Sequence, residues 1–478
     1  MSKTYRKKRK PNNRELRIVC LIFVAIFVAM GLNLAYFIQE DSTSFIYNSY
    51  NPRFTTYTEN VIRGDILSAD GTVLAATVTE NDEEYRYYPY NEIFSHAIGY
   101  VDEGLSGLEA QYSFDLLKTH DSANNQLKND LAKAKSKGDS LYTTLDFNTQ
   151  VAAYNGLGNY KGAVIAMDPD TGEIIAMVSK PDFDPNTIAD YWDEITAEDS
   201  DSSVLLNRAI QGLYPPGSTF KIVTTLSYMR DNEDYEDFSY DCSGQLELND
   251  FTIHCSSNKS HGQEDLKTAF ANSCNCAFAR VGLDSNIYVF NETANKLYFN
   301  TELPTMLRDV KQSTCELTST DSDSLIAQTA IGQGNTQVTP LHMCMLASAI
   351  ANDGEMMEPY LVDRIESSEG YVVSKTSQKS AGSIMTEAEA EKLQEYMSAV
   401  ITDGTADDVD FGDLTVYGKT GTAEFSSNKD EAHSWFVGYA TNSWGKKLAV
   451  AVIMEGAGYG SKYATPLAAS VFEAYFVY

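Results

Sequence analysis

A serine and a lysine stand three residues apart at the start of an apolar segment. Ser218 and Lys221 follow the turn-forming sequence Pro-Pro-Gly in YPPGSTFKIVTTLSYMR, residues 214–230. Apolar residues recur behind them at helical spacing, which predicts a helix with one buried face and the serine in its first turn. Residues three apart share one face of a helix, about 5 to 6 Å apart at Cβ. The Lys221 amine is therefore expected within reach of the Ser218 hydroxyl.

These two side chains could form an activated nucleophile. Serine is a weak nucleophile until a base removes its proton, and lysine is a base only when it is neutral. A helix start would add the Ser218 backbone N–H as an oxyanion donor and would disfavour a charge on Lys221. Ser-x-x-Lys also occurs at Ser256, Ser426 and Ser443. Only Ser218 follows Pro-Pro-Gly and begins an amphipathic segment, so it is the predicted nucleophile.

Two further motifs carry polar groups that such a site could use. SCN spans Ser273 to Asn275, and KTG, which occurs once, spans Lys419 to Gly421. Ser-x-Asn is common in this chain and is not specific by itself. The six histidines offer no Ser-His-Asp arrangement with a G-x-S-x-G elbow, so lysine chemistry is favoured over histidine chemistry.

Charge and hydropathy are unevenly distributed along the 478 residues. The net charge is −31, although residues 1–17 carry eight Lys or Arg and one acid. An acidic body repels nucleic acid, so no nucleic-acid partner is expected. Residues 18–38 contain no charge, and about 20 such residues span a bilayer. A cleaved signal peptide has a shorter apolar part of about 7 to 15 residues, so the sequence predicts an uncleaved transmembrane helix.

The flanking charges predict the side of the membrane on which each part lies. Positively charged flanks stay in the cytoplasm, so residues 1–17 are the expected cytoplasmic tail and the bulk of the chain faces outward. Disulfides are permitted there for the six cysteines beyond Cys20. Cys242 and Cys255 flank a short predicted hairpin and are the best candidate pair. His254 adjoins Cys255, but no second Cys/His pair stands at finger-like spacing, so neither a metal nor a cofactor is expected.

Turn signals divide the rest of the chain. Residues 128–140 resemble a helix end and a linker, and residues 162–179 form two predicted strands joined by an Asp-Pro-Asp-Thr-Gly turn. SWFVGYA and KLAVAVIME predict a second hairpin near the end. Residues 465–476 predict a closing helix capped by Thr465 with Pro466 at its first position. We expect a first domain over residues 39–140 and a second over residues 141–478.

The order and setting of STFK, SCN and GKTGTAE resemble the three active-site motifs of penicillin-binding transpeptidases and serine β-lactamases. Longer segments resemble class B penicillin-binding proteins and cover most of the chain outside the membrane segment. They are RGDILSADGTVLA, GLSGLE, GAVIAMDPDTGEIIAMVSKPDFDPN, NRAIQGLYPPGSTFK, AIGQGNTQVTPLHMCMLASAIANDGEMMEP, DGTA and HSWFVGYA. The resemblance implies an α+β fold, in which an antiparallel sheet is covered by helices beside an all-helical half. It also implies a small pedestal domain over residues 39–140, behind the transmembrane helix.

The family's mechanism, carried onto matching positions, implies a D,D-transpeptidase. Ser218 would attack the penultimate D-alanine of a peptidoglycan stem peptide and expel the last D-alanine, with Lys221 as base. Ser273 would relay a proton to the departing amine, and Asn275 would hold the peptide amide and orient Lys221. The KTG strand, which includes Gly421, would bind the terminal carboxylate through Lys419, Thr420 and Thr422. The backbone N–H of Thr422 would be the second oxyanion donor. A neighbouring stem peptide then accepts the acyl group, which makes a cross-link.

The same resemblance implies partners and a location. β-Lactams would acylate Ser218, and a polytopic SEDS-family glycan polymerase is the expected protein partner. The location would be the bacterial cell membrane, with a single pass and the catalytic domain on the extracytoplasmic face. Three alternatives remain: a β-lactamase, a penicillin sensor, for which the expected cytoplasmic residues 1–17 offer little room for a signalling apparatus, and a scaffold that activates a glycan polymerase while its own site is idle. A role in elongation, division or sporulation is not decided by the sequence.

Overall fold

The computed structural model describes residues 14–36, 61–81, 83–249, 251–423 and 432–477, and the chain divides into two compact units, residues 1–60 and 61–478. In the first unit, helix α1 (Arg14–Tyr36) is described. Its Arg17–Tyr36 part is long and apolar enough to cross a membrane. This agrees with most of the predicted span over residues 18–38, of which residues 37 and 38 lie outside the described part, as do residues 1–13 of the predicted tail.

The second unit begins with a six-stranded sheet in the order β15-β14-β6-β2-β3-β4. Its strands come from two distant parts of the chain, because β6 (Ser140–Thr143) pairs with β14 (Val362–Glu366) on one side and with β2 (Ile66–Leu67) on the other. The remaining elements of this region are β1 (Val61–Ile62), β3 (Val73–Glu80), β4 (Glu83–Tyr87), η2 (Asn91–Phe94), α4 (Ser95–Ile98), α5 (Gly107–Gln111), α6 (Ser113–Leu116), α7 (Ala123–Ala132), β5 (Ser136–Lys137) and β15 (Val372–Lys375).

A buried cluster of three charged side chains holds this region together. The Glu109 carboxylate is fully buried, and its two oxygens accept from Arg63 Nε at 2.6 Å and from Arg86 Nε at 2.7 Å. Burial raises the pKa of Glu109, but the two guanidinium groups outweigh burial and leave its pKa below the usual value. The carboxylate therefore stays ionised and joins the chain before β2, strand β4 and helix α5.

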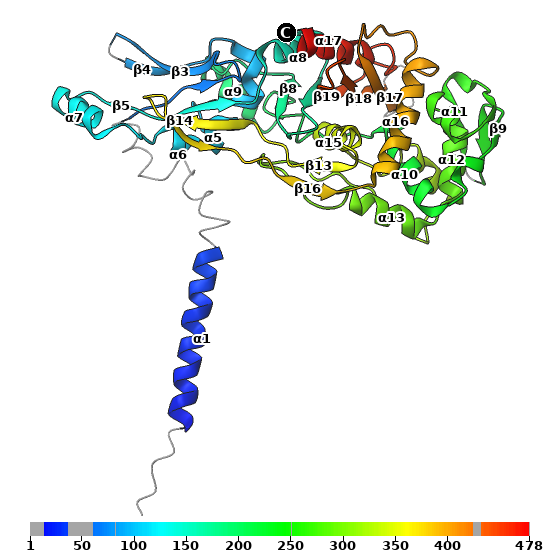
Figure 1. The fold of residues 1–478 in the computed structure, drawn as a ribbon, viewed down its shortest axis with the longest axis horizontal. Helices are drawn as coiled ribbons and strands as arrows, with labels where there is room; N and C mark the ends of the chain where they lie inside the picture. Colours follow the sequence, from blue (N-terminus) through cyan, green and yellow to red (C-terminus); the bar gives the residue numbers. More distant parts are fainter. Residues whose placement is uncertain (1–13, 37–60, 82, 250, 424–431, 478) are drawn as a thin grey trace, which may run out of the picture. The chain divides into compact units, whose positions relative to one another are not determined.

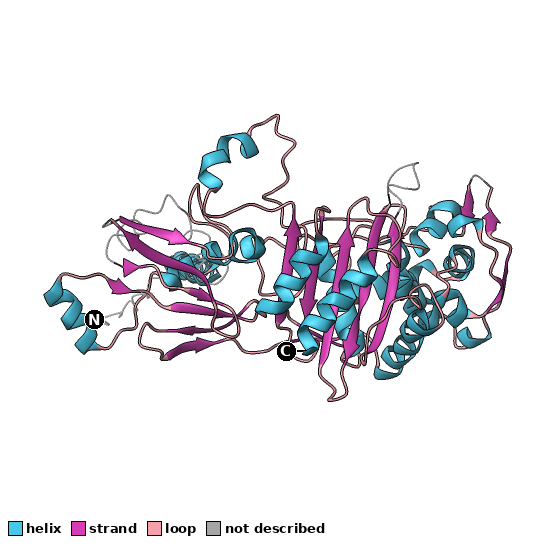
Figure 2. Ribbon diagram, turned by 90° about the horizontal axis from the view of Figure 1, so that it is seen from above, coloured by secondary structure: helices cyan, strands magenta, loops and turns pink. Residues whose placement is uncertain are grey.

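A five-stranded antiparallel sheet in the order β17-β18-β19-β7-β8 forms the centre of the unit. Its strands are β7 (Gly162–Met167), β8 (Ile174–Lys180), β17 (Thr415–Ala423), β18 (His433–Thr441) and β19 (Lys447–Met454). The β7–β8 and β18–β19 pairs confirm both hairpins that the sequence predicts. Figure 2 shows helices lying across this sheet.

Alternate residues of these strands enter two separate apolar cores. One face, which includes Val164 and Phe436, packs with α8 (Phe147–Leu157) and α17 (Ala464–Val477). The other face, which includes Ile165 and Trp435, packs with α15 (Pro340–Ala351). Side chains alternate across a strand, so this sheet is buried on both faces. It is a rigid platform on which the edge strand β17 can be held in place.

The closing helix differs from its prediction at the start. Helix α17 begins at Ala464, so Thr465 lies inside its first turn and is not the cap. The Thr465 hydroxyl donates to the Gly460 carbonyl at 3.0 Å, a backbone group outside the helix. The chain before the helix therefore folds back onto Thr465, which moves the helix start earlier than the Thr-Pro pattern indicates.

A mainly helical region lies next to the β17 edge of this sheet, although most of it precedes β17 in the sequence. Figure 1 shows α10 to α13 together with β9 in this region. Most of its apolar side chains join the core around α15. The remaining elements of the unit are η3 (Ile188–Tyr191), α9 (Trp192–Thr196), η4 (Gly217–Phe220), α10 (Lys221–Asp231), η5 (Tyr235–Asp237), β9 (Tyr240–Cys242), β10 (Gln245–Glu247), β11 (Thr252–His254), η6 (Ser256–Asn258), β12 (Gly262–Glu264), α11 (Leu266–Ala271), α12 (Asn275–Asp284), α13 (Ile287–Lys296), α14 (Asp323–Ala330), β13 (Glu355–Met357), β16 (Ser380–Ser383) and α16 (Glu387–Thr402).

The buried ion cluster predicts a large stability loss on neutralisation. Glu109→Gln leaves two buried guanidinium groups without a counter-charge, so we expect the free energy of unfolding to fall by about 3 to 5 kcal/mol. The matched control is Glu84→Gln, because Glu84 forms a partly exposed ion pair with Lys135 at 2.8 Å, which is worth about 1 kcal/mol or less. Urea titration of the full chain in detergent measures both, and equal losses would contradict the prediction.

Candidate active site

Ser218 lies in a tight turn in front of the buried helix α10. The sequence predicts an α-helical first turn, whereas the structure has a 3₁₀ turn, η4, before α10 begins at Lys221. Residues three apart eclipse one another in a 3₁₀ turn, so Ser218 and Lys221 still share a face. The turn is held in place by two contacts: Gly217 N–H donates to Gly332 O at 2.9 Å, and Trp435 Nε1 donates to Pro215 O at 3.1 Å.

Lys221 is fully buried, and its amine faces the SCN segment. The Nζ atom donates to Ser273 O at 2.7 Å, to Ser273 Oγ at 3.2 Å and to Asn275 Oδ1 at 2.8 Å. Burial lowers the pKa of Lys221 to about 8. In the described part of the chain the half-buried Ser218 hydroxyl forms no hydrogen bond with this amine, so the direct contact expected from their spacing is absent here.

The SCN segment is a strained connection between α11 and α12. Ser273 has φ +54°, a backbone conformation that costs a non-glycine residue about 1 to 3 kcal/mol and is typical of functional sites. Asn275 begins α12, and its Nδ2 donates to His254 O at 3.0 Å while its Oδ1 accepts from Lys221. Asn275 therefore connects the Lys221 amine to the chain that follows strand β11.

Lys419 of strand β17 reaches the same serine hydroxyl from the other side. It is fully buried, and its Nζ donates to Ser273 Oγ at 3.0 Å and to Thr420 O at 3.2 Å. Burial, together with the charge of Lys221, lowers the pKa of Lys419 well below its usual value. The Ser273 hydroxyl thus lies between two lysine amines, which repel each other when both are charged.

The rest of the KTG strand runs past the serine turn. A Cβ at Gly421 would lie 2.8 Å from Thr219 Cγ2, so only glycine allows the strand to approach this closely. The half-buried Thr422 hydroxyl accepts from Gly460 N–H at 3.4 Å. The Thr420 hydroxyl instead pairs with Thr405 Oγ1 at 2.5 Å.

Five of the predicted residues are thereby brought to one place by the fold. Hydrogen bonds join Lys221, Ser273, Asn275 and Lys419, and Ser218 leads into Lys221. Thr405 is a residue of the site for which the sequence analysis predicts no role, although it lies in the DGTA segment that carries part of the resemblance. Of the other Ser-x-x-Lys serines, Ser256 and Ser443 are exposed, and Ser426 lies outside the described residues.

The expected disulfide between Cys242 and Cys255 is not present. Both are free cysteines, with their sulfurs 3.6 Å apart. Cys255 also contacts the sulfurs of Cys274 at 3.7 Å and Cys276 at 3.4 Å, so it has three thiol neighbours and no single partner. The hairpin that the pair flanks does form, since β10 and β11 are antiparallel neighbours.

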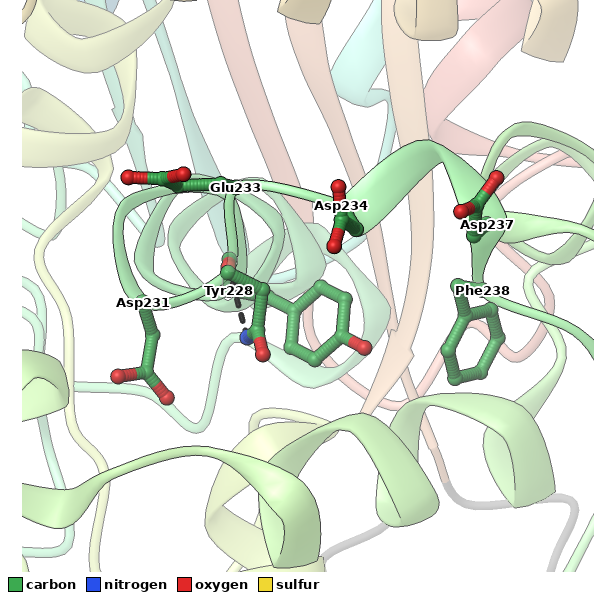
Figure 3. Close-up of a pocket in the computed structure, with 7 residues that line it drawn as sticks. Tyr228, Asp231, Glu233, Asp234, Asp237 and Phe238 are labelled. Atoms are coloured by element: carbon green, nitrogen blue, oxygen red, sulfur yellow. Dashed lines mark hydrogen bonds between the residues drawn. The ribbon is translucent and has the colours of Figure 1, made fainter.

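A cavity of about 420 Å³ lies at the opposite end of helix α10 from the serine turn. Figure 3 shows its acidic side chains pointing in different directions, so they do not converge on a common point. It is therefore separate from the site around Lys221. Its lining residues are Tyr228, Asp231, Asn232, Glu233, Asp234, Asp237 and Phe238.

Comparison with known proteins gives consistent matches over most of the chain. Residues 162–473 match the family model described as penicillin binding protein transpeptidase domain, and residues 63–141 match the penicillin binding protein A dimerisation domain. A protein named peptidoglycan D,D-transpeptidase PbpA from Mycolicibacterium smegmatis is 30% identical over 426 residues, which cover 83% of this chain and 84% of that protein. One named peptidoglycan D,D-transpeptidase MrdA from Acinetobacter baumannii is 28% identical over 444 residues, 81% of this chain and 65% of that protein.

Solved structures give the same picture. Penicillin-binding protein A from M. tuberculosis, as a ceftriaxone acyl-enzyme complex, has a TM-score of 0.79 at 26% identity, covering 88% of this chain and 100% of that one. The D,D-transpeptidase domain of a peptidoglycan glycosyltransferase from Eggerthella lenta has a TM-score of 0.77 at 30% identity, covering 87% and 99%.

The close approach of the serine turn to β17 makes any side chain at Gly217 unfavourable. Gly217 has φ +52°, and a Cβ there would lie 2.7 Å from Thr422 O. Gly217→Ala should cost about 1 to 2 kcal/mol of backbone strain and about 1 to 3 kcal/mol more for the clash. Gly412→Ala is the matched control, because Gly412 has φ +61° and open space at its Cβ position, so it should lose the strain cost alone. Urea unfolding of both variants checks this, and equal costs would rule out the clash.

Proposed function

The chain belongs to the penicillin-binding protein transpeptidase family, and from that premise we propose that it is a membrane-anchored peptidoglycan D,D-transpeptidase acting through an acyl-enzyme at Ser218. The observation that carries the assignment to this serine is the buried chain of hydrogen bonds from Lys221 through the Ser273 hydroxyl to Lys419, next to the serine turn. It supplies a base that can be neutral near physiological pH, which is what serine activation by lysine needs.

The hydrogen-bond partners around Ser273 can also serve a neutral base. As a donor of three bonds, the Lys221 amine donates to Ser273 O, Asn275 Oδ1 and Ser273 Oγ. A neutral amine has two hydrogens and one lone pair, so on losing its proton Lys221 can keep the bonds to Ser273 O and Asn275 Oδ1 and accept from the Ser273 hydroxyl instead of donating to it. That hydroxyl in turn accepts from Lys419. When Lys221 turns toward Ser218, it can take the serine proton as Oγ attacks the carbonyl of the penultimate D-alanine.

The later steps use the same groups. The oxyanion that forms accepts from the backbone N–H groups of Ser218 and Thr422, and its collapse breaks the bond to the terminal D-alanine. Ser273 passes the proton held by Lys221 to the departing amine. The amine of a second stem peptide then attacks the ester and releases Ser218, which completes the cross-link.

Lys419 is assigned to the terminal carboxylate of the donor peptide. Before substrate binds, burial and Lys221 disfavour its charge. An incoming carboxylate would favour the ammonium form of Lys419, because an opposite charge nearby stabilises an ion. Thr422 would donate its hydroxyl to the same carboxylate beside Gly421. Thr420 completes this binding set in our proposal, with Thr405 holding its hydroxyl in place.

The location and partners follow from the anchor and from the family. We assign residues 1–17 to a cytoplasmic tail, 18–38 to the membrane helix, 39–140 to a pedestal and 141–478 to the transpeptidase domain on the extracytoplasmic face. The Arg17–Tyr36 part of α1 is exposed and is apolar enough to lie in a bilayer. A SEDS-family glycan polymerase, a membrane protein, is the partner that this helix and the pedestal would contact.

The first test is covalent labelling. Benzylpenicillin should form one stable adduct per chain on the peptide that contains STFK, and Ser218→Ala should abolish it. The opened ring stays attached to the acyl group and blocks the acceptor amine, so intact-protein mass spectrometry should detect the adduct for many minutes. Rapid drug turnover without an adduct would indicate a β-lactamase, and absence of any reaction would indicate an idle scaffold. Labelling at Ser256, Ser426 or Ser443 would show that a serine other than Ser218 is the nucleophile.

The second test is the pH dependence of that acylation. A base with a pKa of about 8 is protonated below that value, so the acylation rate should rise roughly tenfold per pH unit up to about 8 and then level off. Lys221→Ala should lose this dependence and at least about 10² in rate. Lys267→Ala is the control, because Lys267 lies on α11 in a surface ion pair with Glu395 and should keep the wild-type profile. A profile that is flat in the wild type would exclude Lys221 as the base.

A further inference from the structure

Four cysteines and one histidine from separate parts of the sequence meet beside the active site. Cys242 ends β9, Cys255 follows β11, and Cys274 and Cys276 lie at the start of α12. All four sulfurs belong to buried residues, and half-buried His261 completes the group. The mechanism proposed above gives none of these side chains a role.

The separations within this group fit a tetrahedral metal site. Cys255 Sγ lies 3.6 Å from Cys242 Sγ and 3.7 Å from Cys274 Sγ, and Cys242 Sγ lies 3.5 Å from His261 Nδ1. Around a tetrahedral zinc ion, with Zn–S near 2.3 Å and Zn–N near 2.0 Å, neighbouring sulfurs lie about 3.8 Å apart and a sulfur and a nitrogen about 3.6 Å apart. A disulfide needs its sulfurs at about 2.05 Å. The ligand atoms of these four residues all lie within 4.8 Å of one another.

The surrounding backbone favours negatively charged sulfur. Gly244 N–H donates to Cys242 Sγ at 3.4 Å, and Ala277 N–H donates to Cys274 Sγ at 3.4 Å at the N-terminus of α12. Helix N-termini stabilise thiolates. Thiolate and imidazole are the ligands that zinc prefers in structural sites.

The local fold has few other means of support. The strand pairs β9–β12 and β10–β11 have three residues in each strand and are two-stranded sheets. Two-stranded pairs of this length are marginally stable by themselves. Cys242 ends β9, Cys255 directly follows β11, and Cys274 is the N-cap residue of α12, so an ion bound by all three would tie both strand pairs to the helix.

We propose that Cys242, Cys255, His261 and Cys274 bind one structural zinc ion. Binding is redox-neutral: each of the three thiols gives up its proton to solvent as its sulfur bonds to the ion, and His261 binds as a neutral imidazole. Cys276 lies outside the four and keeps its contact with Ile253 O at 3.8 Å. The spacing, Cys-x12-Cys-x5-His-x12-Cys, matches no zinc-finger pattern, which is why the sequence predicted no metal.

The ion would also position two groups of the active site. Cys274 stands between Ser273 and Asn275, and Cys255 follows His254, whose carbonyl accepts from Asn275 Nδ2. Fixing Cys255 and Cys274 to one ion fixes both ends of that hydrogen bond. Asn275 is then held where its Oδ1 accepts from Lys221. The zinc site is thus a positioning device for the SCN segment and takes no part in bond making.

The test uses the full chain purified in detergent without chelator. Elemental analysis should give one zinc per chain, and denaturing mass spectrometry should show all seven cysteines as thiols. Removal of zinc by a strong chelator should lower the melting temperature, and added zinc, but not magnesium, should restore it. Cobalt in place of zinc should produce the thiolate charge-transfer and d–d absorption bands of a tetrahedral site.

Matched variants separate this site from a general loss of folding. Cys242→Ser should lose the zinc, His261→Cys should keep it because a fourth sulfur replaces the nitrogen, and Cys344→Ser should keep it because buried Cys344 lies far along the chain in α15. Benzylpenicillin acylation should slow by about 10- to 100-fold in Cys242→Ser and stay at the wild-type rate in Cys344→Ser.

Two results would overturn the zinc site. The first is a wild-type chain that contains no zinc after purification without chelator and takes up none when zinc is added. The second is a mass lower by two hydrogens for each disulfide formed among these cysteines. Both are measured on metal and thiols alone, so they are independent of whether penicillin labels Ser218.

Discussion

The active site depends on the burial of two lysine amines around a single serine hydroxyl. Moving a charged amine out of water costs several kcal/mol, and two such charges also repel each other. Lys221 and Lys419 are both fully buried, and both approach Ser273 Oγ, at 3.2 and 3.0 Å. The pair is therefore most stable with at most one positive charge, so one of the two amines is neutral, and the site has a lysine base without a histidine.

Such an arrangement persists only if its surroundings are rigid. The two amines belong to a helix and a strand, and the hydroxyl between them belongs to a connection with a strained backbone, so any one of these could relax by moving away. Gly217 and Gly421 allow the turn and the strand to pack closely. The Trp435 side chain of β18 bonds to the chain just before the turn. The sheet behind them is buried on both faces, which prevents the edge strand from moving.

The SCN segment is held from the opposite side by the chain around the cysteine cluster. Asn275 receives support from His254 O, and Cys274 Sγ accepts from the first turn of α12. The SCN segment is therefore restrained on two sides. On one side the amines of Lys221 and Lys419 donate to it, and on the other the chain around β9 to β12 contacts it. A strained φ at Ser273 is tolerated because the neighbouring residues are fixed on both sides.

Features set by neighbouring residues were determined by the sequence alone. The Asp-Pro-Asp-Thr-Gly turn between two apolar runs produces the β7–β8 hairpin, and the Pro-Pro-Gly turn places Ser218 ahead of a helix. The prediction that this helix is buried on one face only was wrong, because every residue of α10 from Lys221 to Tyr228 is buried. The apolar run of α1 predicts a membrane-spanning helix from its own length and composition, without reference to any other segment. In each case the signal is a periodicity or a turn residue within a few positions of the feature itself.

Only the tertiary structure decided which distant segments meet. Pairing of β6 with β14 joins residues 140–143 to residues 362–366, and the Thr405–Thr420 contact and the cysteine cluster likewise join separate segments. The local sequence pattern does not identify such partners. It shows that a strand or a cysteine will be buried, but not which distant segment it will contact. The turn at Ser218 became 3₁₀, and α17 began early at Ala464, because contacts with Gly332 and Gly460 outweigh local propensity. The residues of the site could be named from the sequence, but the hydrogen bonds among them arise only when helix, loop and edge strand pack together.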